Sequence, residues 1–249
     1  MKFSILGPLE VRTADASVEL PALRHRRILA ALLLAPGGRL STERLIEAAW
    51  DSPGPPTARK QVQNCVAALR RRLIEQGASP TMLVTRPGGY QLDVPDDHVD
   101  ARIFTHLVEL ARRTAQDQAG QAVRLYRSAL TLWRGRALEG LDGHAFGPSA
   151  AWLTELRLTA AEECFDLELS NGLHLQAVPD LVSLAAENLS RERLQAQLMT
   201  ALHRCGRQVE TFQVYQRVHD YVATEIGSEP GVELKLLRER LLRERGAWP

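Results

Sequence analysis

The spacing of hydrophobic residues changes along the chain, and each change predicts a different element. Near the start, apolar residues alternate with polar or small ones on both sides of a Gly-Pro turn, at Phe3, Ile5, Leu9 and Val11. A period of two predicts two short β-strands, and Val18 and Leu20 are candidates for a third. Helical spacing then predicts helices over residues 24–35 and 42–50, the second of which Ser41 can cap.

A longer helix is predicted over residues 58–76, and its two faces differ in chemistry. One stripe is hydrophobic at spacings of i, i+4, i+7 and i+11, formed by Val62, Val66, Leu69 and Leu73. The remaining surface carries cations, amides and a small residue, namely Arg59, Lys60, Gln61, Gln63, Asn64, Ala67, Arg70 and Arg71. Arg and Lys bind phosphates or guanine, and Gln and Asn pair with adenine edges. This face is typical of a helix that lies in the major groove of DNA.

A β-hairpin is predicted directly after this helix. Two β-rich runs within residues 83–94 flank the turn Pro87-Gly88-Gly89, and Arg86 lies just before the tip. A helix followed by a hairpin with a basic residue is the layout of a winged helix. The sequence therefore predicts a DNA-binding domain over residues 1–96.

The pattern becomes almost purely helical after the segment Pro95-Asp96-Asp97-His98, which we interpret as a domain boundary. Amphipathic helices are predicted at 101–116, 119–133, 148–171, 174–189, 191–205, 207–226 and 231–245. The pair 191–205 and 207–226 meets at Gly206 and spans roughly the ~34-residue period of a tetratricopeptide hairpin. The expected fold is mainly α with a small β component: a winged helix followed by an all-α, tetratricopeptide-like domain over residues 97–249.

Charge and composition narrow the class of protein. The chain of 249 residues has a net charge of +1, but residues 1–96 hold 13 Lys and Arg against 9 Asp and Glu, while residues 97–249 carry a net charge of −3. A basic first half suits a nucleic-acid module. Apolar runs are far shorter than a membrane span, so no membrane partner is expected. The isolated cysteines, Cys65, Cys164 and Cys205, suit a reduced, cytoplasmic protein. As a DNA-binding protein it is expected to be associated with the nucleoid.

Motifs for enzymatic chemistry are missing from the sequence. It contains no G-x-x-x-x-G-K-[ST], no H-E-x-x-H and no G-x-S-x-G, and its seven histidines lack metal-ligand spacing. We therefore expect no catalytic residues, no metal and no cofactor. The basic run Arg24-His25-Arg26-Arg27 at a helix start indicates either a phosphate or acidic-surface contact or a plain exposed helix start.

Along nearly its whole length the chain resembles the SARP family, the Streptomyces antibiotic regulatory proteins. The similar segments include FSILGPLEVR, PPTARKQVQNCVAALRRRL and LVTRPGGYQLDV in the first half, and LMTALHRCGRQVETFQVYQRVHDYVATEIGSEPGVEL in the second. The resemblance implies an OmpR-type winged helix followed by a bacterial transcriptional activation domain. It also implies a small member of the family, without the nucleotide-binding and sensor modules of larger relatives.

The function implied by this resemblance is transcriptional activation of a secondary-metabolite gene cluster. The expected partners are double-stranded DNA with direct repeats, a second copy of the chain on that DNA, and RNA polymerase holoenzyme including its σ factor. By helical phase, Gln63 and Ala67 should contact bases, while Arg59, Lys60 and Arg71 should hold phosphates and Arg70 could do either. Arg86 is similar in position to the wing arginine that OmpR-type domains place at the minor groove.

A second class of function stays open from the residues alone. The charged face of the 58–76 helix could be a solvated surface, which would leave a helical-repeat interaction or peptide-sensing protein with only weak DNA binding. Salt-dependent, sequence-selective DNA binding distinguishes the two.

Overall fold

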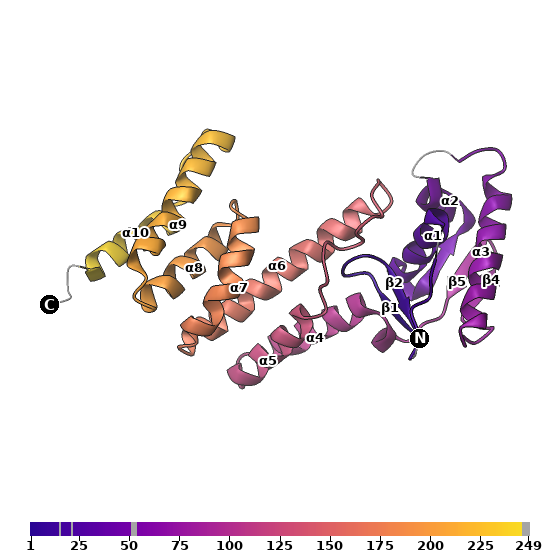
Figure 1. Cartoon of the computed structure of the whole chain (residues 1–249), viewed down its shortest axis with the longest axis horizontal. Coiled ribbons are helices and arrows are strands. Elements are labelled where there is room, and N and C mark those ends of the chain that lie inside the picture. Colours follow the sequence, from indigo (N-terminus) through magenta and orange to yellow (C-terminus); the bar gives the residue numbers. More distant parts are fainter. Residues whose placement is uncertain (15, 21, 51–53, 246–249) are drawn as a thin grey trace. The chain divides into compact units, whose positions relative to one another are not determined.

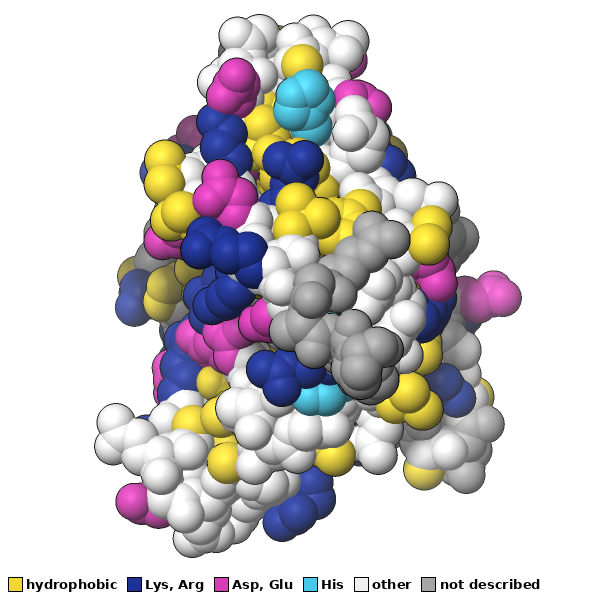
Figure 2. Space-filling model, turned by 90° about the vertical axis from the view of Figure 1, so that its left-hand side faces the viewer, with side chains coloured by type: hydrophobic (Ala, Val, Ile, Leu, Met, Phe, Trp, Pro, Cys, Tyr) yellow, Lys and Arg dark blue, Asp and Glu magenta, His cyan; other side chains and the backbone are white. Residues whose placement is uncertain are grey.

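The computed structural model describes residues 1–14, 16–20, 22–50 and 54–245, and Figure 1 traces the chain. Its residues form two compact units, which we describe separately. The first unit contains residues 1–113 and 125–158, and the second contains residues 114–124 and the chain from Thr159 onward. Charged side chains of both signs lie at the surface with hydrophobic side chains exposed among them (Figure 2).

Two short antiparallel strands begin the first unit. Strand β1 (Lys2–Ser4) pairs with β2 (Glu10–Arg12), and the inward residues Phe3 and Val11 face each other and are buried. The predicted third strand at Val18 and Leu20 is wrong, because among the described residues only a single bridge, between Arg12 and Ser17, joins this segment to β2.

The helices α1 (Leu23–Leu34), α2 (Thr42–Trp50) and α3 (Ala58–Glu75) follow, as the hydrophobic spacing predicts. The three pack against one another around buried residues that include Ile28, Leu32 and Leu45. Ser41 precedes α2, and its Oγ accepts a hydrogen bond of 3.2 Å from the amide of Arg44, which satisfies one of the free donors at the helix start.

A three-stranded antiparallel sheet completes the winged helix. The predicted hairpin forms as β4 (Leu83–Arg86) and β5 (Gly89–Leu92), and β5 also pairs with β3 (Arg39–Ser41), a strand that the hydrophobic pattern misses. The backbone of β3 crosses so close to Gly89 that a Cβ atom there would lie 2.0 Å from the carbonyl oxygen of Leu40. Only glycine fits where the wing meets β3.

The rest of the chain is mainly helical, as predicted, with the irregular segment 131–146 between α5 and α6. The elements are α4 (Asp100–Thr114), α5 (Ala119–Leu130), α6 (Gly147–Ser170), α7 (His174–Glu187), α8 (Glu192–Arg204), α9 (Gln208–Tyr221), a π-helical turn (Val222–Ile226) and α10 (Val232–Arg245). In the second unit α8 packs against both α7 and α9, and Gly206 adopts a left-handed conformation (φ 74°) between α8 and α9. No helix of the described residues is long and apolar enough to cross a bilayer.

Polar side chains fix α8 to the second-unit part of α6. Glu162 is buried, and its carboxylate accepts a hydrogen bond of 2.8 Å from Nε of Arg191. Nε2 of the buried Gln197 donates to the backbone oxygen of Glu162 at 2.8 Å. The charge of Glu162 is therefore paired where water does not reach it.

The first unit continues beyond the boundary that the sequence predicts at residue 96. The carboxylate of Asp100 is buried and accepts hydrogen bonds from the amides of Ile5 (2.8 Å) and Leu6 (3.0 Å), and from that of Ala101 (2.8 Å). Arg134 donates its own amide proton to the oxygen of Leu6 at 2.8 Å. The N-terminal strands are thus bonded to residues that follow the winged helix.

The carboxyl group of Asp100 lies in a site that opposes its ionisation. Burial raises the pKa of its carboxyl group, while the hydrogen bonds from Ile5, Leu6 and Ala101 and the charge of Arg134, 3.8 Å away, act in the opposite direction.

We expect Asp100→Ala to lower the free energy of unfolding by about 2–4 kcal/mol, because it leaves the buried amides of Ile5 and Leu6 without an acceptor. Chemical unfolding of the full chain measures this. Asp97→Ala is the matched control: Asp97 is exposed, so its removal should change stability by less than about 0.5 kcal/mol. Equal effects of the two substitutions would contradict the role of Asp100.

Candidate nucleic-acid interface

Helix α3 separates into a buried stripe and an exposed face. Val62, Val66, Leu69 and Leu73 are at most 1% exposed, as the spacing predicts. At 100° per residue, Lys60, Asn64, Ala67 and Arg71 lie opposite this stripe and Gln63 lies at its flank, and all five are exposed. The buried stripe packs against α1 and α2, so the polar face points away from the core.

Gln61 lies at the edge of this face and makes contacts within the protein. Its Nε2 donates to Oγ1 of Thr57 at 2.9 Å, and its Oε1 accepts a hydrogen bond of 3.4 Å from Arg24. Arg24 also lies over the ring of Trp50, 4.9 Å from its centroid. These contacts tie the first turn of α3 to α1 and α2.

Arg59, at the start of α3, is paired with Glu43 of α2 in an exposed salt bridge. A backbone hydrogen bond is the largest cause that lowers the pKa of Glu43; weak burial opposes it, and Arg59 lowers the pKa further. An exposed pair of this kind contributes little to stability. Arg59 can therefore exchange this carboxylate for a phosphate at small cost.

Arg70 is half-buried and turned toward the wing. Its Nε donates to the backbone oxygen of Leu83 at 2.8 Å, and Nη2 lies 3.3 Å from Oγ1 of Thr85. Both acceptors belong to β4. The guanidinium of Arg70 therefore joins the exposed helix to the wing.

The wing is held by a second set of polar contacts. Nε of Arg86 donates to Oε1 of Gln91 at 2.9 Å, and Nε2 of Gln91 donates to the backbone oxygen of Gly37 at 3.2 Å. Arg86 itself is exposed at the end of β4. Its side chain is therefore oriented by the sheet while its charge faces solvent.

Arg39 is a candidate contact that the sequence pattern did not indicate. It is exposed on β3, and its Nη2 lies 3.4 Å from the backbone oxygen of Pro87 at the wing turn. The three residues of β3 are too few to show a period, so nothing in the sequence placed this cation beside the wing.

One residue of the basic run at the start of α1 is part of the hydrophobic core. Arg27 is buried, donates from Nε to the oxygen of Ala48 at 2.6 Å, and lies over the ring of Phe146.

Two titratable side chains near this run have pKa values that burial shifts. Burial lowers the pKa of the neighbouring His25. Burial also raises the pKa of the Cys65 thiol on α3, against the charge of Arg24.

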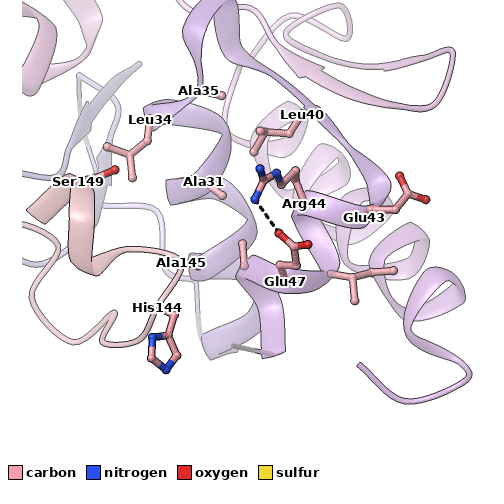
Figure 3. Close-up of a pocket in the computed structure, with 12 residues that line it drawn as sticks. Ala31, Leu34, Ala35, Leu40, Glu43, Arg44, Glu47, His144, Ala145 and Ser149 are labelled. Atoms are coloured by element: carbon pink, nitrogen blue, oxygen red, sulfur yellow. Dashed lines mark hydrogen bonds and ion pairs between the residues drawn. The ribbon is translucent and has the colours of Figure 1, made fainter. Parts of the chain in front are cut away.

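A groove of about 860 Å³ lies beside α1 and α2 in the first unit. Figure 3 shows short apolar side chains on its walls, among them Ala31, Leu34 and Ala145, with the ion pair of Arg44 and Glu47 at its edge. His144 and Ser149 also line it. The residues that line the groove provide mainly apolar contacts, and they do not include a nucleophile hydrogen-bonded to a base.

Within the described ranges, His, Cys, Asp and Glu form no group that could hold a metal ion.

Comparison with known proteins assigns a family to each part of the chain. Residues 17–92 match the family described as transcriptional regulatory protein, C terminal, and residues 99–242 match the bacterial transcriptional activator domain. The regulatory protein DnrI of Streptomyces peucetius is 31% identical, over 98% of this chain and 92% of its own length. These families and relatives are regulators and not enzymes.

Longer relatives share the same residues. The regulatory protein AfsR of Streptomyces griseus is 33% identical over 98% of this chain, which spans only 24% of its length. The solved structure of Mycobacterium tuberculosis EmbR, in complex with a low affinity phosphopeptide, superposes with a TM-score of 0.88 at 31% identity. It is matched over 98% of this chain and 65% of EmbR.

We expect Arg70→Ala to lower the free energy of unfolding by about 1–2 kcal/mol, because the charged hydrogen bonds to β4 are lost from a half-buried site. Thermal or urea unfolding of the full chain measures this. Arg71→Ala removes an arginine from the next position, where only an exposed 3.8 Å pair with Glu75 is lost, and should change stability by less than about 0.5 kcal/mol. A loss no larger for Arg70→Ala than for Arg71→Ala would show that Arg70 does not join α3 to the wing.

Proposed function

Because the chain belongs to the SARP family of transcriptional regulators, we propose that it is a sequence-specific activator of a secondary-metabolite gene cluster. In this proposal it binds direct repeats near a promoter and recruits RNA polymerase holoenzyme through its σ factor. The pathway follows from the family resemblance, and the DNA contact is argued from the geometry of α3 and the wing.

The exposed face of α3 is the observation that carries the DNA-binding role. Gln63, Asn64 and Ala67 lie on the exposed side of α3, away from the buried stripe, where a helix in the major groove meets base edges. In the described part of the chain, the side chains of Gln63 and Asn64 make no intramolecular hydrogen bond. Their amide groups are therefore available to bases.

Cations on this face and beside it suit the phosphate backbone. Lys60 and Arg71 lie on the exposed face itself, and Arg59 lies beside it in a weak pair with Glu43. Charged contacts to phosphates set affinity and its salt dependence, while base contacts set sequence preference.

The wing supplies a separate contact in this proposal. Arg86 projects from the end of β4 toward the minor groove or the backbone beside it, with Arg39 nearby on β3. Gln61 and Arg70 support the interface from within the protein, since their side chains bond to Thr57, Leu83 and Thr85.

Two copies of the chain are proposed to bind head to tail on direct repeats. A repeat of about one helical turn, ~10–11 bp, places both copies on the same face of the duplex. The helical domain of each copy then faces the polymerase, while the winged helices locate the promoter.

We expect Gln63→Ala and Lys60→Ala to have different effects on DNA binding. Gln63→Ala should cost about 1–3 kcal/mol on an operator duplex, selected from random DNA by the full chain, and relax preference at one base position. Lys60→Ala should weaken binding to every duplex and flatten the salt slope by about one unit. Titration of operator and scrambled duplexes across salt concentrations measures both. Equal losses on both duplexes for Gln63→Ala would remove its base-reading role.

We expect activation to depend on the helical phase of the two repeats. Inserting about 5 bp between them turns the copies to opposite faces of the duplex and should abolish transcription, whereas inserting about 10 bp restores the phase. In vitro transcription with the full chain and purified polymerase holoenzyme measures this. Equal transcription from templates with and without the half-turn insertion would rule out paired binding as the mechanism.

A further inference from the structure

Arg24 is the exposed cation of the basic run at the start of α1. Arg27 of the same run is buried and bonded to Ala48, so it belongs to the core. Arg24 lies in the first turn of α1, where a positive charge opposes the helix dipole and does not stabilise the helix. Within the ranges that the structure describes, its guanidinium contacts Gln61 and Trp50 and pairs with no carboxylate. The charge of Arg24 is therefore open to a ligand of opposite sign.

Two contacts hold this guanidinium in place at the surface. Its Nη1 donates to Oε1 of Gln61 at 3.4 Å, and its Cζ lies 4.9 Å from the centroid of the Trp50 ring. Gln61 is itself fixed, because its Nε2 donates to Oγ1 of Thr57 at 2.9 Å. Stacking on the ring and a single hydrogen bond leave most of the guanidinium N–H donors toward solvent. An arginine held in this way is pre-organised to bind an oxyanion.

Helical phase places Arg24 and the wing on opposite sides of α3. Gln61, which bonds to Arg24, and Arg70, which bonds to β4 of the wing, are nine positions apart on the helix. At 100° per residue this separation is about two and a half turns, so the two side chains leave the helix in opposite directions. The exposed face of α3 lies between these two flanks. Burial raises the pKa of the Cys65 thiol, one turn beyond Gln61, and the nearby charge of Arg24 opposes this shift.

Farther along the same flank of α3 the charges have mixed signs. A hollow of about 360 Å³ lies there, and its lining includes His25 of α1, Arg71 and Arg72 of α3, and the carboxylates of Glu19 and Glu75. Glu75 is 3.8 Å from Arg71. An anion is therefore favoured at the start of α3, beside Arg24, more than it is farther along the helix.

We propose that Arg24 binds a DNA phosphate on the border of the major groove that lies across α3 from the wing. The inference rests on the proposed function, in which α3 lies in the major groove, and it adds a contact on the second side of the helix. The two phosphate backbones border the groove, so a helix within it has phosphates on both sides. Arg86 serves the wing side in that function, and Arg24 serves the opposite side.

Contacts on both borders of the groove also set the direction of the domain on DNA. The wing side and the α1 side of α3 differ in structure, so the two borders receive different contacts. Phosphate contacts fix register and orientation. A domain held on both borders fits its site in one direction, which suits the head-to-tail pairing proposed for direct repeats.

The first test replaces Arg24 by Ala in the full chain. Affinity should fall about three- to tenfold on operator and scrambled duplexes alike, and the salt slope should flatten by about one unit, because one phosphate contact is lost. Arg113→Ala is the matched control: Arg113 is also exposed in a helix of the first unit, α4, but lies outside the winged helix. Its removal should change affinity by less than about twofold. A loss confined to the operator, with the salt slope unchanged, would show that Arg24 acts only by holding α3 and would overturn the proposal.

Arg24→Lys separates the charge from the packing of this side chain. Lysine keeps the charge and loses the planar stack on Trp50 and the bond to Gln61. The variant should keep the native salt slope and recover part of the affinity that Arg24→Ala loses. If Arg24→Lys matches Arg24→Ala in both affinity and salt slope, the charge makes no phosphate contact and the proposal fails.

Single neutral methylphosphonates along both strands of the operator locate the contact. At the phosphate that Arg24 binds, the replacement should weaken binding of the native chain and leave binding of the Arg24→Ala chain unchanged. Hydroxyl-radical protection that is lost in Arg86→Ala marks the wing side of the same site. The Arg24 phosphate should lie on the opposite border of the major groove. Finding no such phosphate, or one on the wing side, would contradict the assignment.

The native chain separates this inference from the function on which it rests. If the native chain prefers the operator and Arg24→Ala binds it as tightly, Arg24 has no DNA contact, while the proposed function stands. Weaker binding of that variant to purified polymerase would then assign Arg24 to an acidic protein surface instead. If the native chain binds operator and scrambled duplexes equally, the proposed function and the role of Arg24 fail together.

Discussion

The first unit depends on the carboxylate of Asp100, because this group accepts the hydrogen bonds of the backbone amides that follow β1. The amides of Ile5 and Leu6 are buried, so in the folded protein they have no water to bond with, and a single side chain 94 or 95 residues away accepts from both. Arg134 and Leu138 add backbone hydrogen bonds to the oxygens of Leu6 and Ile5. The backbone groups of Ile5 and Leu6 are therefore satisfied by residues of the first unit that lie after the wing.

Contacts on the other sides of α3 fix the helix so that its polar face stays exposed to solvent. Aliphatic burial holds the helix against α1 and α2, Gln61 bonds at its first turn, and Arg70 bonds to β4 in its second half. The wing is oriented in turn by Gln91, which bridges Arg86 and Gly37. Helix and wing are thus held in a fixed relation, which in the proposed DNA complex reduces the entropy lost on binding.

Periodic features of the fold could be predicted from the sequence, and features set by contacts between distant segments could not. The stripe from Val62 to Leu73 and the turn at Pro87-Gly88 are local signals, and both gave correct elements. Strand β3 exists because β5 offers it a partner, and three residues carry no period of their own. Arg70 looks like its neighbours in sequence, and only the position of β4 shows that its guanidinium faces inward. For the same reason no spacing revealed that Asp100 belongs to the core of the winged helix.

The side chains proposed to read bases make no bond that the fold requires. Gln63, Asn64 and Ala67 are exposed, and the residues that secure α3 occupy other positions on the helix. Substitutions at these three positions therefore have little effect on folding, and stability places few limits on which residues occur there. In evolutionary terms, a gene duplicate of such a regulator can acquire a new set of target promoters by small steps, each of which leaves a folded protein for selection to act on.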